Sequence, residues 1–274
     1  MKFIRMPSWA KYFMLTYGIT WFFWGIAVFL RLPISAMPIP ILIAVGGIGP
    51  VASALILSYS IEKKSYRVSY WQRFLDVRRM GWKWLLGSFL VPVVMTIVAG
   101  CLDQLLHGNG LSIPDRFSQN FFSLIPFAIF SLFFGPIPEE MGWRGYALGK
   151  LQGKFNPLAA SLILGCVWFV WHIPLFFIPD SYQNSLVVNR QIPLWFFPAN
   201  IILQTISMTY IFNQTRGSTL SAVIFHFSVN FCGEMFAISP RGAFFQILLW
   251  AFTAAAICLH WSRNKNSDNR SLLS

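Results

Sequence analysis

The stretch that decides the fold class is residues 84–102, which read WLLGSFLVPVVMTIVAGCL and contain no charged residue. A helix needs about 20 such apolar residues to cross the hydrocarbon core of a bilayer. Similar runs recur along the chain, and they predict eight membrane-spanning helices at 10–30, 39–60, 83–105, 119–138, 157–178, 193–213, 218–236 and 243–261. The runs are continuously apolar rather than alternating, which excludes a β-barrel. The sequence therefore predicts an all-α polytopic membrane protein, with its helices around a polar intramembrane cavity.

The composition of the whole chain supports this class. Hydrophobic residues make up 56% of the 274 residues and charged residues 11%, with 28 Phe and 12 Trp. A soluble globule of this size could not bury so much apolar surface, and a disordered, collagen-like or disulfide-framework chain has a different composition. The four cysteines form no CxxC pair, so neither a disulfide framework nor a thiolate zinc site is indicated.

The basic residues predict the orientation. If the N-terminus is cytoplasmic, the inside segments hold 17 of the 21 Lys and Arg residues, most densely in the loop 62–83, whereas the outside holds Arg31, Arg116, Arg190 and Arg241. This bias predicts that both termini lie inside, and it explains the net charge of +12 by topology and anionic lipid rather than by a nucleic-acid partner. The apolar run in residues 1–30 is longer than that of a signal peptide, so we expect a retained first helix. We expect an integral protein of a prokaryotic plasma membrane.

A cluster of ionisable residues follows the fourth predicted span. The segment 135–145 reads GPIPEEMGWRG, and its prolines predict that the helix restarts with Pro138 at its first position. Both Glu139 and Glu140 then fall in the first turn, towards the cytoplasmic side. Glu140 and Arg144 are four residues apart and can pair on one face, which leaves the Glu139 carboxylate free for another task. A membrane-edge ion pair with a solvated glutamate is the alternative interpretation.

Two further spans carry polar groups at membrane depth. His172 lies among aromatic residues in the fifth span, and His226 and Asn230 share one helical face of the seventh. Taken singly, each is typical of a structural role, such as interhelical hydrogen bonding. Glu234 is a weaker candidate, and His107 and His260 fall at span ends. Together the three groups hold most of the polar chemistry that the chain places within its spans, so we expect one cavity to gather them.

Two chemical interpretations fit this set. In the first, Glu139 and His172 remove a proton from water, while His226 and Asn230 donate hydrogen bonds to the developing oxyanion. In the second, Glu139, His172 and His226 bind zinc with water as the fourth ligand. The sequence contains no HExxH pair, the strongest signature of a zinc protease.

The three motifs in this order resemble the CAAX protease and bacteriocin-processing family of intramembrane endopeptidases, also called the abortive-infection domain family, which includes the type II CAAX prenyl proteases. The resemblance covers residues 119–236. It implies that Glu139 and His172 activate water, that His226 and Asn230 form the oxyanion hole, and that Arg144 anchors the first motif through Glu140. The second motif of the family usually begins with Phe where this chain has Trp168. Because both rings are apolar, we expect this difference to change the shape of the pocket more than its chemistry.

The resemblance and the spans together divide the chain into three parts. Residues 1–118 hold three helices and the basic loop, 119–236 form the catalytic core, and 237–274 hold the last helix and a polar tail. The expected activity is hydrolysis of a peptide bond in a membrane-associated substrate, either a prenylated CAAX protein or a bacteriocin-like peptide, near the cytoplasmic half of the bilayer and without a cofactor. A transporter, in which the buried Glu, His and Arg residues conduct ions, and a non-catalytic immunity or scaffold protein are the alternatives.

Overall fold

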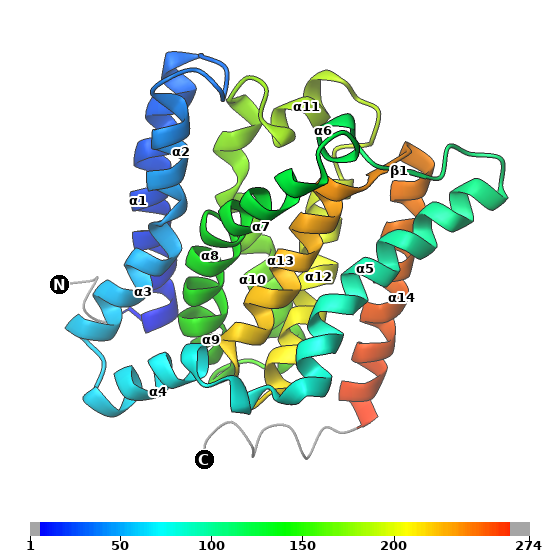
Figure 1. Ribbon diagram of the computed structural model, residues 1–274. Helices are drawn as coiled ribbons and strands as arrows, with labels where there is room; N and C mark the ends of the chain where they lie inside the picture. Colours follow the sequence, from blue (N-terminus) through cyan, green and yellow to red (C-terminus); the bar gives the residue numbers. More distant parts are fainter. Residues whose placement is uncertain (1–5, 264–274) are drawn as a thin grey trace.

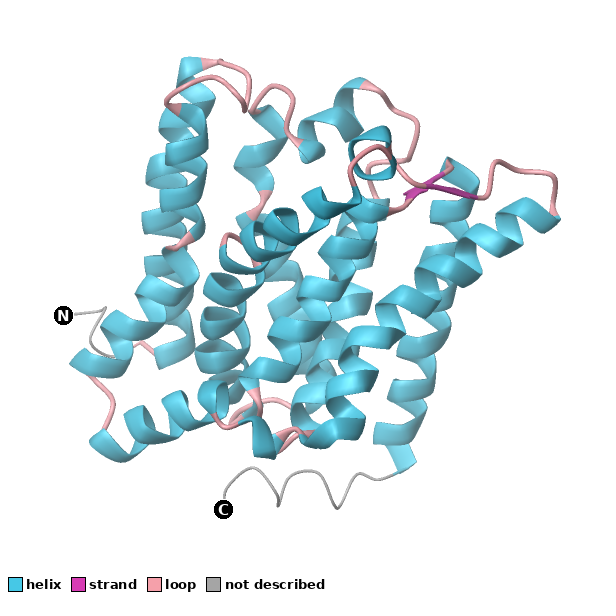
Figure 2. Ribbon diagram, viewed as in Figure 1, coloured by secondary structure: helices cyan, strands magenta, loops and turns pink. Residues whose placement is uncertain are grey.

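The computed structural model describes residues 6–263, which form a bundle of helices (Figures 1 and 2). The long helices that run between the two ends of the bundle are α1 (Ser8–Leu30), α5 (Gly81–Leu105), α10 (Pro157–Trp171), α12 (Phe196–Gln214), α13 (Thr219–Met235) and α14 (Pro240–Arg263). Many large apolar side chains point outward, among them Phe29, Phe133 and Phe252. Such a surface suits a lipid environment. The predicted all-α polytopic fold class is confirmed.

The number of membrane spans differs from the predicted eight. Six helical segments within the described residues are long and apolar enough to cross a membrane: Ser8–Leu30, Ile39–Ser60, Gly81–Leu105, Phe121–Gln152, Pro157–Phe177 and Pro240–Arg263. The other two predicted spans fall on α12 and α13. Helix α13 has only 17 residues, and α12 carries polar residues such as Asn200, Gln204 and Asn213, which lower its hydropathy. The count of eight is therefore not confirmed, although each predicted span is helical.

Shorter elements connect the long helices. The second span is divided into α2 (Ile39–Gly47) and α3 (Gly49–Ser60), both of which pack against α1. Helix α4 (Lys64–Leu75) and the 3-10 turn η2 (Val77–Arg79) lie at the lower end of the bundle in Figure 1, and α6 (Asp115–Ser118) and α11 (Tyr182–Val188) lie at the upper end. Also at the upper end, the two-residue strands β1 (Leu111–Ser112) and β2 (Ala237–Ile238) pair antiparallel.

The fourth span is a single broken helical segment, and its shape positions the first motif. It comprises η3 (Phe121–Ser123), α7 (Leu124–Phe133), α8 (Pro136–Gly142), the π-helical segment η4 (Trp143–Leu148) and α9 (Gly149–Gln152). The break falls at Gly135, whose φ of −143° and ψ of −86° are not helical. The new helix begins at Pro136 and not at Pro138 as predicted. A proline is tolerated at the first helical position because the N–H that it lacks would have no partner in the helix there. Only Glu139 therefore lies in the first turn.

This broken segment corrects the predicted depth of Glu139. The predicted span ended at residue 138, just before the glutamates, whereas the helical segment runs from Phe121 to Gln152 with Glu139 in its interior. In Figure 1 the segment descends from α7 near the upper end to α9 at the lower end. Glu139 is thus within the bundle, above the end at which the basic loop lies. The predicted end of this span at residue 138 is therefore too early, whereas the side of the membrane towards which Glu139 lies stays a prediction.

The basic residues gather at the lower end of the bundle, where α4, η2 and the turn before α13 meet (Figure 1). Arg79 and Arg216 connect two of these segments, since Arg79 Nη1 donates to the carbonyl of Arg216 and Arg216 Nη2 donates to that of Arg78. Arg144, which the charge count placed in an inside loop, is instead fully buried in the bundle and adds nothing to the bias. Residues 1–5 and the polar tail 264–274, with four of the counted basic residues, lie outside the described residues.

Glycines allow the helices to approach one another closely around the first motif. A Cβ atom on Gly142 would lie 2.3 Å from the Tyr12 hydroxyl and 2.6 Å from the backbone of Pro50. A Cβ on Gly165 of α10 would lie 3.1 Å from the Cα of Ile202 in α12. Small residues at such contacts are typical of helix packing in membranes. Helices α1 and α3 thus support α8 directly from one side.

Candidate functional site

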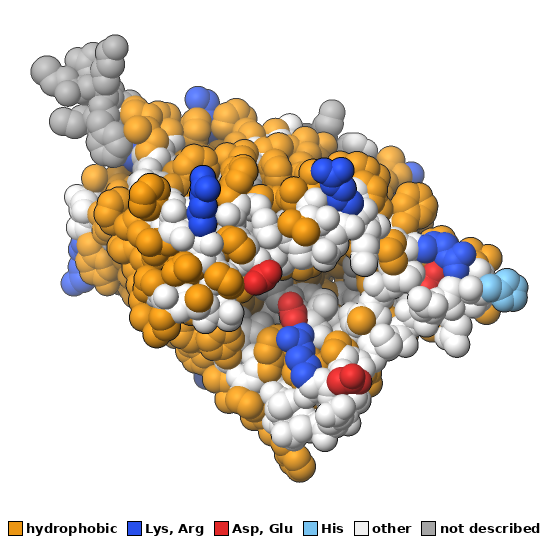
Figure 3. Space-filling model, turned by 90° about the horizontal axis from the view of Figure 1, so that it is seen from above, with side chains coloured by type: hydrophobic (Ala, Val, Ile, Leu, Met, Phe, Trp, Pro, Cys, Tyr) orange, Lys and Arg blue, Asp and Glu red, His pale blue; other side chains and the backbone are white. Residues whose placement is uncertain are grey.

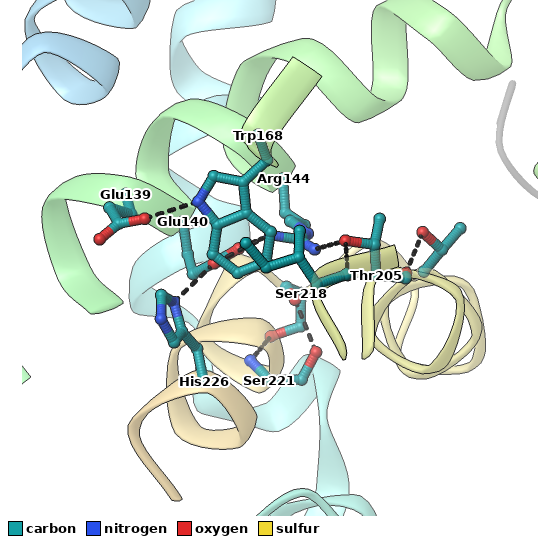
Figure 4. A network of polar contacts seen from close by, with 10 residues as sticks. Glu139, Glu140, Arg144, Trp168, Thr205, Ser218, Ser221 and His226 are labelled. Atoms are coloured by element: carbon teal, nitrogen blue, oxygen red, sulfur yellow. Dashed lines mark hydrogen bonds and ion pairs between the residues drawn. The ribbon is translucent and has the colours of Figure 1, made fainter. Parts of the chain in front are cut away.

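The two glutamates of the first motif point to different partners, as their spacing predicts. Both are buried: Glu140 is fully inaccessible, and Glu139 retains 9% exposure. Consecutive helical residues are rotated by about 100°, so that their side chains leave the helix on different faces. Figure 4 shows the Glu139 carboxylate directed to one side of α8 and that of Glu140 directed into a network with Arg144 and His226.

The predicted pair between Glu140 and Arg144 is present. Arg144 Nη1 lies 2.9 Å from both carboxylate oxygens of Glu140, and neither side chain is exposed. Arg144 Nη2 also donates to the hydroxyl of Thr205 on α12, at 3.2 Å. The guanidinium lies over the ring of Trp168, 4.7 Å from its centroid. A buried charge needs this degree of pairing, because desolvation of an unpaired ion costs several kcal/mol.

Glu140 has a second partner that sequence analysis did not identify. His226 Nδ1 lies 2.9 Å from Glu140 Oε1, which connects α13 to α8. A carboxylate can only accept, so Nδ1 carries the hydrogen and donates it. The Nε2 atom of His226 lies on the opposite side of the ring, and the ring itself meets Trp168 edge-on at a centroid distance of 5.1 Å.

Glu139 is hydrogen-bonded to a tryptophan. Trp168 Nε1 donates to Glu139 Oε2 at 2.8 Å, within the buried part of the bundle. From the sequence alone, position 168 is expected to be an apolar ring that affects mainly the shape of the pocket. That expectation is wrong, because the indole N–H is a donor and Glu139 accepts its hydrogen bond.

His172 follows the last residue of α10 and contacts the backbone of the same tryptophan. Its Nδ1 is 2.7 Å from the backbone carbonyl of Trp168. A carbonyl only accepts, so Nδ1 is the protonated nitrogen and Nε2 of the neutral ring keeps a lone pair. The ring packs against Trp171 and Phe197, at centroid distances of 4.7 and 5.4 Å. These contacts fix the orientation of the imidazole.

Asn230 lies one turn beyond His226 on α13, close to the point at which α8 begins. Its amide nitrogen would be 3.7 Å from a Cβ atom built on Gly135. Glu139 is one helical turn from Gly135, since its N–H donates to the Gly135 carbonyl at 3.1 Å. The structure thus brings the Asn230 amide to the same end of α8 as Glu139.

The other candidates lie outside this site. Glu234 forms an exposed ion pair with Arg116 of α6. His107 follows the end of α5 and is exposed, and His260 on α14 packs against Tyr210 of α12. All four cysteines are free thiols. Within residues 6–263, no group of three or more His, Cys, Asp or Glu side chains is arranged to hold a metal ion. The zinc set of Glu139, His172 and His226 stays a prediction.

The site lies towards the end of the bundle opposite the basic loops. Helix α8 begins, α10 ends and α13 ends in this direction, at the upper end of Figure 1. Seen from above, this end of the molecule is hollowed near its centre, with acidic and basic side chains at the rim (Figure 3). If the end with the basic loops is cytoplasmic, as the charge count predicts, the site lies nearer the outer end of the bundle. That position does not agree with the prediction of cleavage near the cytoplasmic half of the bilayer.

Two comparisons with known proteins bear on this arrangement. Residues 121–232 match the model of a family described as type II CAAX prenyl endopeptidase Rce1-like. The predicted resemblance is confirmed. The chain is also 28% identical over 261 residues to CAAX prenyl protease 2 of Methanococcus maripaludis, an alignment that covers 91% of this chain and 92% of the relative. Both matches support a protease, an enzyme that hydrolyses peptide bonds, and the family match includes all four candidate catalytic residues.

Proposed function

We propose that the protein is an intramembrane endopeptidase in which Glu139 and His172 activate a water molecule for attack on a peptide bond. One observation carries the proposal. Glu139 accepts a hydrogen bond from the indole of Trp168, and His172 donates one to the backbone carbonyl of the same residue. A single residue therefore connects a carboxylate and an imidazole, since its indole holds Glu139 and its backbone carbonyl holds His172. Both have an acceptor left for water: Oε1 of the glutamate and Nε2 of the histidine.

Proton removal is the task of these two acceptors. A general base must lie within hydrogen-bond reach of the proton that it takes, and a carboxylate paired with a neutral imidazole meets this need for water. Because Nδ1 of His172 is already bonded to a carbonyl, this histidine can accept the proton from water only at Nε2. The nearly complete burial of Glu139 limits competition from bulk water.

The oxyanion formed by attack needs donors, and we assign these to His226 and Asn230. Donors of this kind contribute about 2.7–4 kcal/mol each in a water-excluded site. Asn230 donates through its amide. His226 already uses Nδ1 to bond Glu140, so it donates to the oxyanion from Nε2, which requires a hydrogen on both ring nitrogens at that step. Glu140 and Arg144 act by orienting this histidine.

The proposed mechanism uses no metal ion. Several of the atoms that could bind zinc already have protein partners: Nδ1 of each histidine and Oε2 of Glu139. Each residue also has a task in water activation or oxyanion binding. Residues 119–236 form the catalytic core in this proposal, and α1, α3 and α5 support it from outside.

The substrate that we propose is a membrane-anchored peptide with a prenylated CAAX end. The name of the Methanococcus relative, CAAX prenyl protease 2, supports this class. The many lipid-facing aromatic and aliphatic side chains suit a substrate whose anchor lies in the bilayer. A bacteriocin-like peptide without a prenyl group is the competing substrate, and the assay can include both.

The test is cleavage of a farnesylated CAAX peptide by the full chain in liposomes, followed by mass spectrometry. Glu139→Gln keeps the shape of the side chain but loses its basicity, and His226→Ala removes an oxyanion donor. We expect each change to reduce the rate at least about 100-fold. Glu234→Gln, which alters an exposed ion pair on the same helix as His226, is the control and is expected to cleave normally.

The outcomes separate the alternatives. Cleavage that survives both substitutions contradicts the assigned roles. Absence of cleavage by the wild type, with ion flux in the same liposomes that depends on Glu139, indicates a transporter. Cleavage of the unprenylated peptide alone moves the substrate to the bacteriocin-like class while the mechanism stands.

A further inference from the structure

Trp168 contacts more of the site than any of the candidate catalytic residues. It is 4% exposed, in the last turn of α10. Its side chain reaches Glu139, Arg144 and His226, and its backbone carbonyl reaches His172 (Figure 4 shows the three side chains). We infer that Trp168 is a positioning residue of the reaction, which aims the Glu139 carboxylate at the water through the indole N–H. This inference rests on the proposed endopeptidase function.

The hydrogen bond to Glu139 is strong and directional. Its 2.8 Å length lies within the short half of the usual range for an N–H donor. Indole has one N–H and no acceptor in the ring plane, so it stabilises only a carboxylate oxygen turned towards it. Because Oε2 is held, Oε1 has one defined direction. A glutamate with its free rotamers would have to be ordered at each turnover instead.

The indole is itself prevented from turning. The guanidinium of Arg144 lies 4.7 Å from the ring centroid, and the His226 ring meets it edge-on at 5.1 Å. Arg144 in turn is held by Glu140 and by Thr205 of α12. A cation over the ring and a perpendicular imidazole leave the indole one orientation. Its N–H therefore points towards Glu139 before any substrate arrives.

A phenylalanine at this position could make most of these contacts, but not the one with Glu139. The ring of Phe offers a face to Arg144 and an edge to His226, and its backbone carbonyl is the same for His172. It has no N–H. Trp168→Phe is therefore a selective substitution, which removes the support of Glu139 and leaves the rest of the set.

The kinetic test compares this variant with a matched control. Trp71→Phe removes an indole hydrogen bond of another kind, that to the hydroxyl of Tyr59, which joins α4 to α3 at the basic end of the bundle. For Trp168→Phe we expect kcat to fall about 10- to 100-fold with KM within about twofold. The lost hydrogen bond orients Glu139, and Glu139 acts on the water molecule and not on the bound substrate. For Trp71→Phe we expect unchanged kcat. Thermal unfolding of both in detergent shows whether either effect is structural.

A spectroscopic test detects the bond without activity. In protein with ¹⁵N-labelled tryptophan, the indole signal of Trp168 is the one absent from Trp168→Phe. We expect this signal to shift in Glu139→Gln and to stay in place in Glu234→Gln. If Trp168→Phe does not fold, Trp168→Tyr replaces it in both tests, since tyrosine also lacks the indole N–H and fills more of its volume.

The results distinguish this inference from the function on which it rests. If the wild type cleaves and Trp168→Phe has the same kcat, the positioning role is wrong and the proposed function stands. The positioning role is equally wrong if the indole signal of Trp168 does not shift in Glu139→Gln, or if the two Trp→Phe variants lose activity equally. If the wild type cleaves neither peptide, or if its cleavage does not depend on Glu139, the proposed function fails and the positioning role fails with it.

Discussion

Arg144 Nη1 is 2.9 Å from each carboxylate oxygen of Glu140, and His226 Nδ1 is equally far from one of them, with no exposed surface on either member of the ion pair. A buried carboxylate that serves two partners is structural and functional at once. It neutralises the guanidinium, and it sets the proton position on the histidine.

Glu140→Gln is expected to destabilise the fold, because it leaves Arg144 as a buried charge without a counter-ion. Breaking one partner of such a pair typically costs about 3–5 kcal/mol. Unfolding titrations in mixed micelles measure the change. Glu234→Gln removes an exposed ion pair with Arg116 and is expected to change stability by less than about 1 kcal/mol. Equal effects of the two substitutions would show that burial of the Glu140 pair does not matter.

Gly142→Ala tests the close approach of α8 to α1 and α3. The added methyl would lie 2.6 Å from the backbone of Pro50, which cannot turn aside as a side chain can. Overpacking of this kind costs about 1–3 kcal/mol, so we expect a lower melting temperature and reduced activity. The control is Gly18→Ala in α1, where a Cβ atom meets nothing within 4 Å and the helix gains propensity. A stable Gly142→Ala protein would falsify the packing argument.

The sequence was sufficient for the fold class and for one pair within the site. Continuous apolar runs determine helices in a membrane, and the spacing of Glu140 and Arg144 determines their contact, because both are consequences of local geometry. The place at which the fourth span breaks was predicted two residues too late. Pro136 and Pro138 are both candidates for the first position there, and the conformation of Gly135 decides between them.

Contacts between distant helices could not be predicted from spacing. The bond between Trp168 and Glu139 spans 29 residues, and that between His226 and Glu140 spans 86. Each depends on how α8, α10 and α13 pack. One signal was available for the first: a tryptophan carries a donor that needs a partner when it is buried. The indole at position 168 therefore indicated a polar neighbour.

Asn230→Ala is expected to reduce kcat about 100- to 1,000-fold with little change in KM, because an oxyanion donor acts in the transition state and not on bound substrate. Steady-state kinetics on the farnesylated peptide measure this. Asn200→Ala is the matched control, since the amide nitrogen of Asn200 donates to the carbonyl of Phe196 in its own helix. A change in KM alone would move Asn230 from the oxyanion hole to substrate binding.

Metal removal is expected to leave the activity intact. In the proposed mechanism Glu139 and His172 bind water and His226 binds the oxyanion, so none of them is needed as a zinc ligand. We expect the cleavage rate to stay within about twofold after dialysis against 1,10-phenanthroline. We expect elemental analysis to find less than about 0.1 zinc per chain. Loss of activity that returns with added zinc would instead support the zinc-dependent mechanism.

The orientation of the bundle decides from which side the site is reached. Helix α5 runs from the basic end, near Arg79, to the opposite end, near the loop that contains Asn109. Helix α8 begins and helices α10 and α13 end towards the latter end, which brings Glu139, His172 and Asn230 nearer to it. Seen from above, this end is hollowed (Figure 3). The basic residues at the α4 end predict that this end is cytoplasmic. The end of the bundle nearer the site then faces the outer side.

Cysteine labelling tests this orientation in intact cells. Lys64 and Asn109 are exposed at opposite ends of the bundle, and each is replaced by Cys in a chain whose four native cysteines are changed to Ala. We expect a membrane-impermeant maleimide to label Asn109→Cys in intact cells and Lys64→Cys only after permeabilisation. The reverse pattern would overturn the orientation derived from charge. It would place the hollowed end of the bundle on the cytoplasmic side, so that a substrate anchored in the inner leaflet approaches Glu139 from that side.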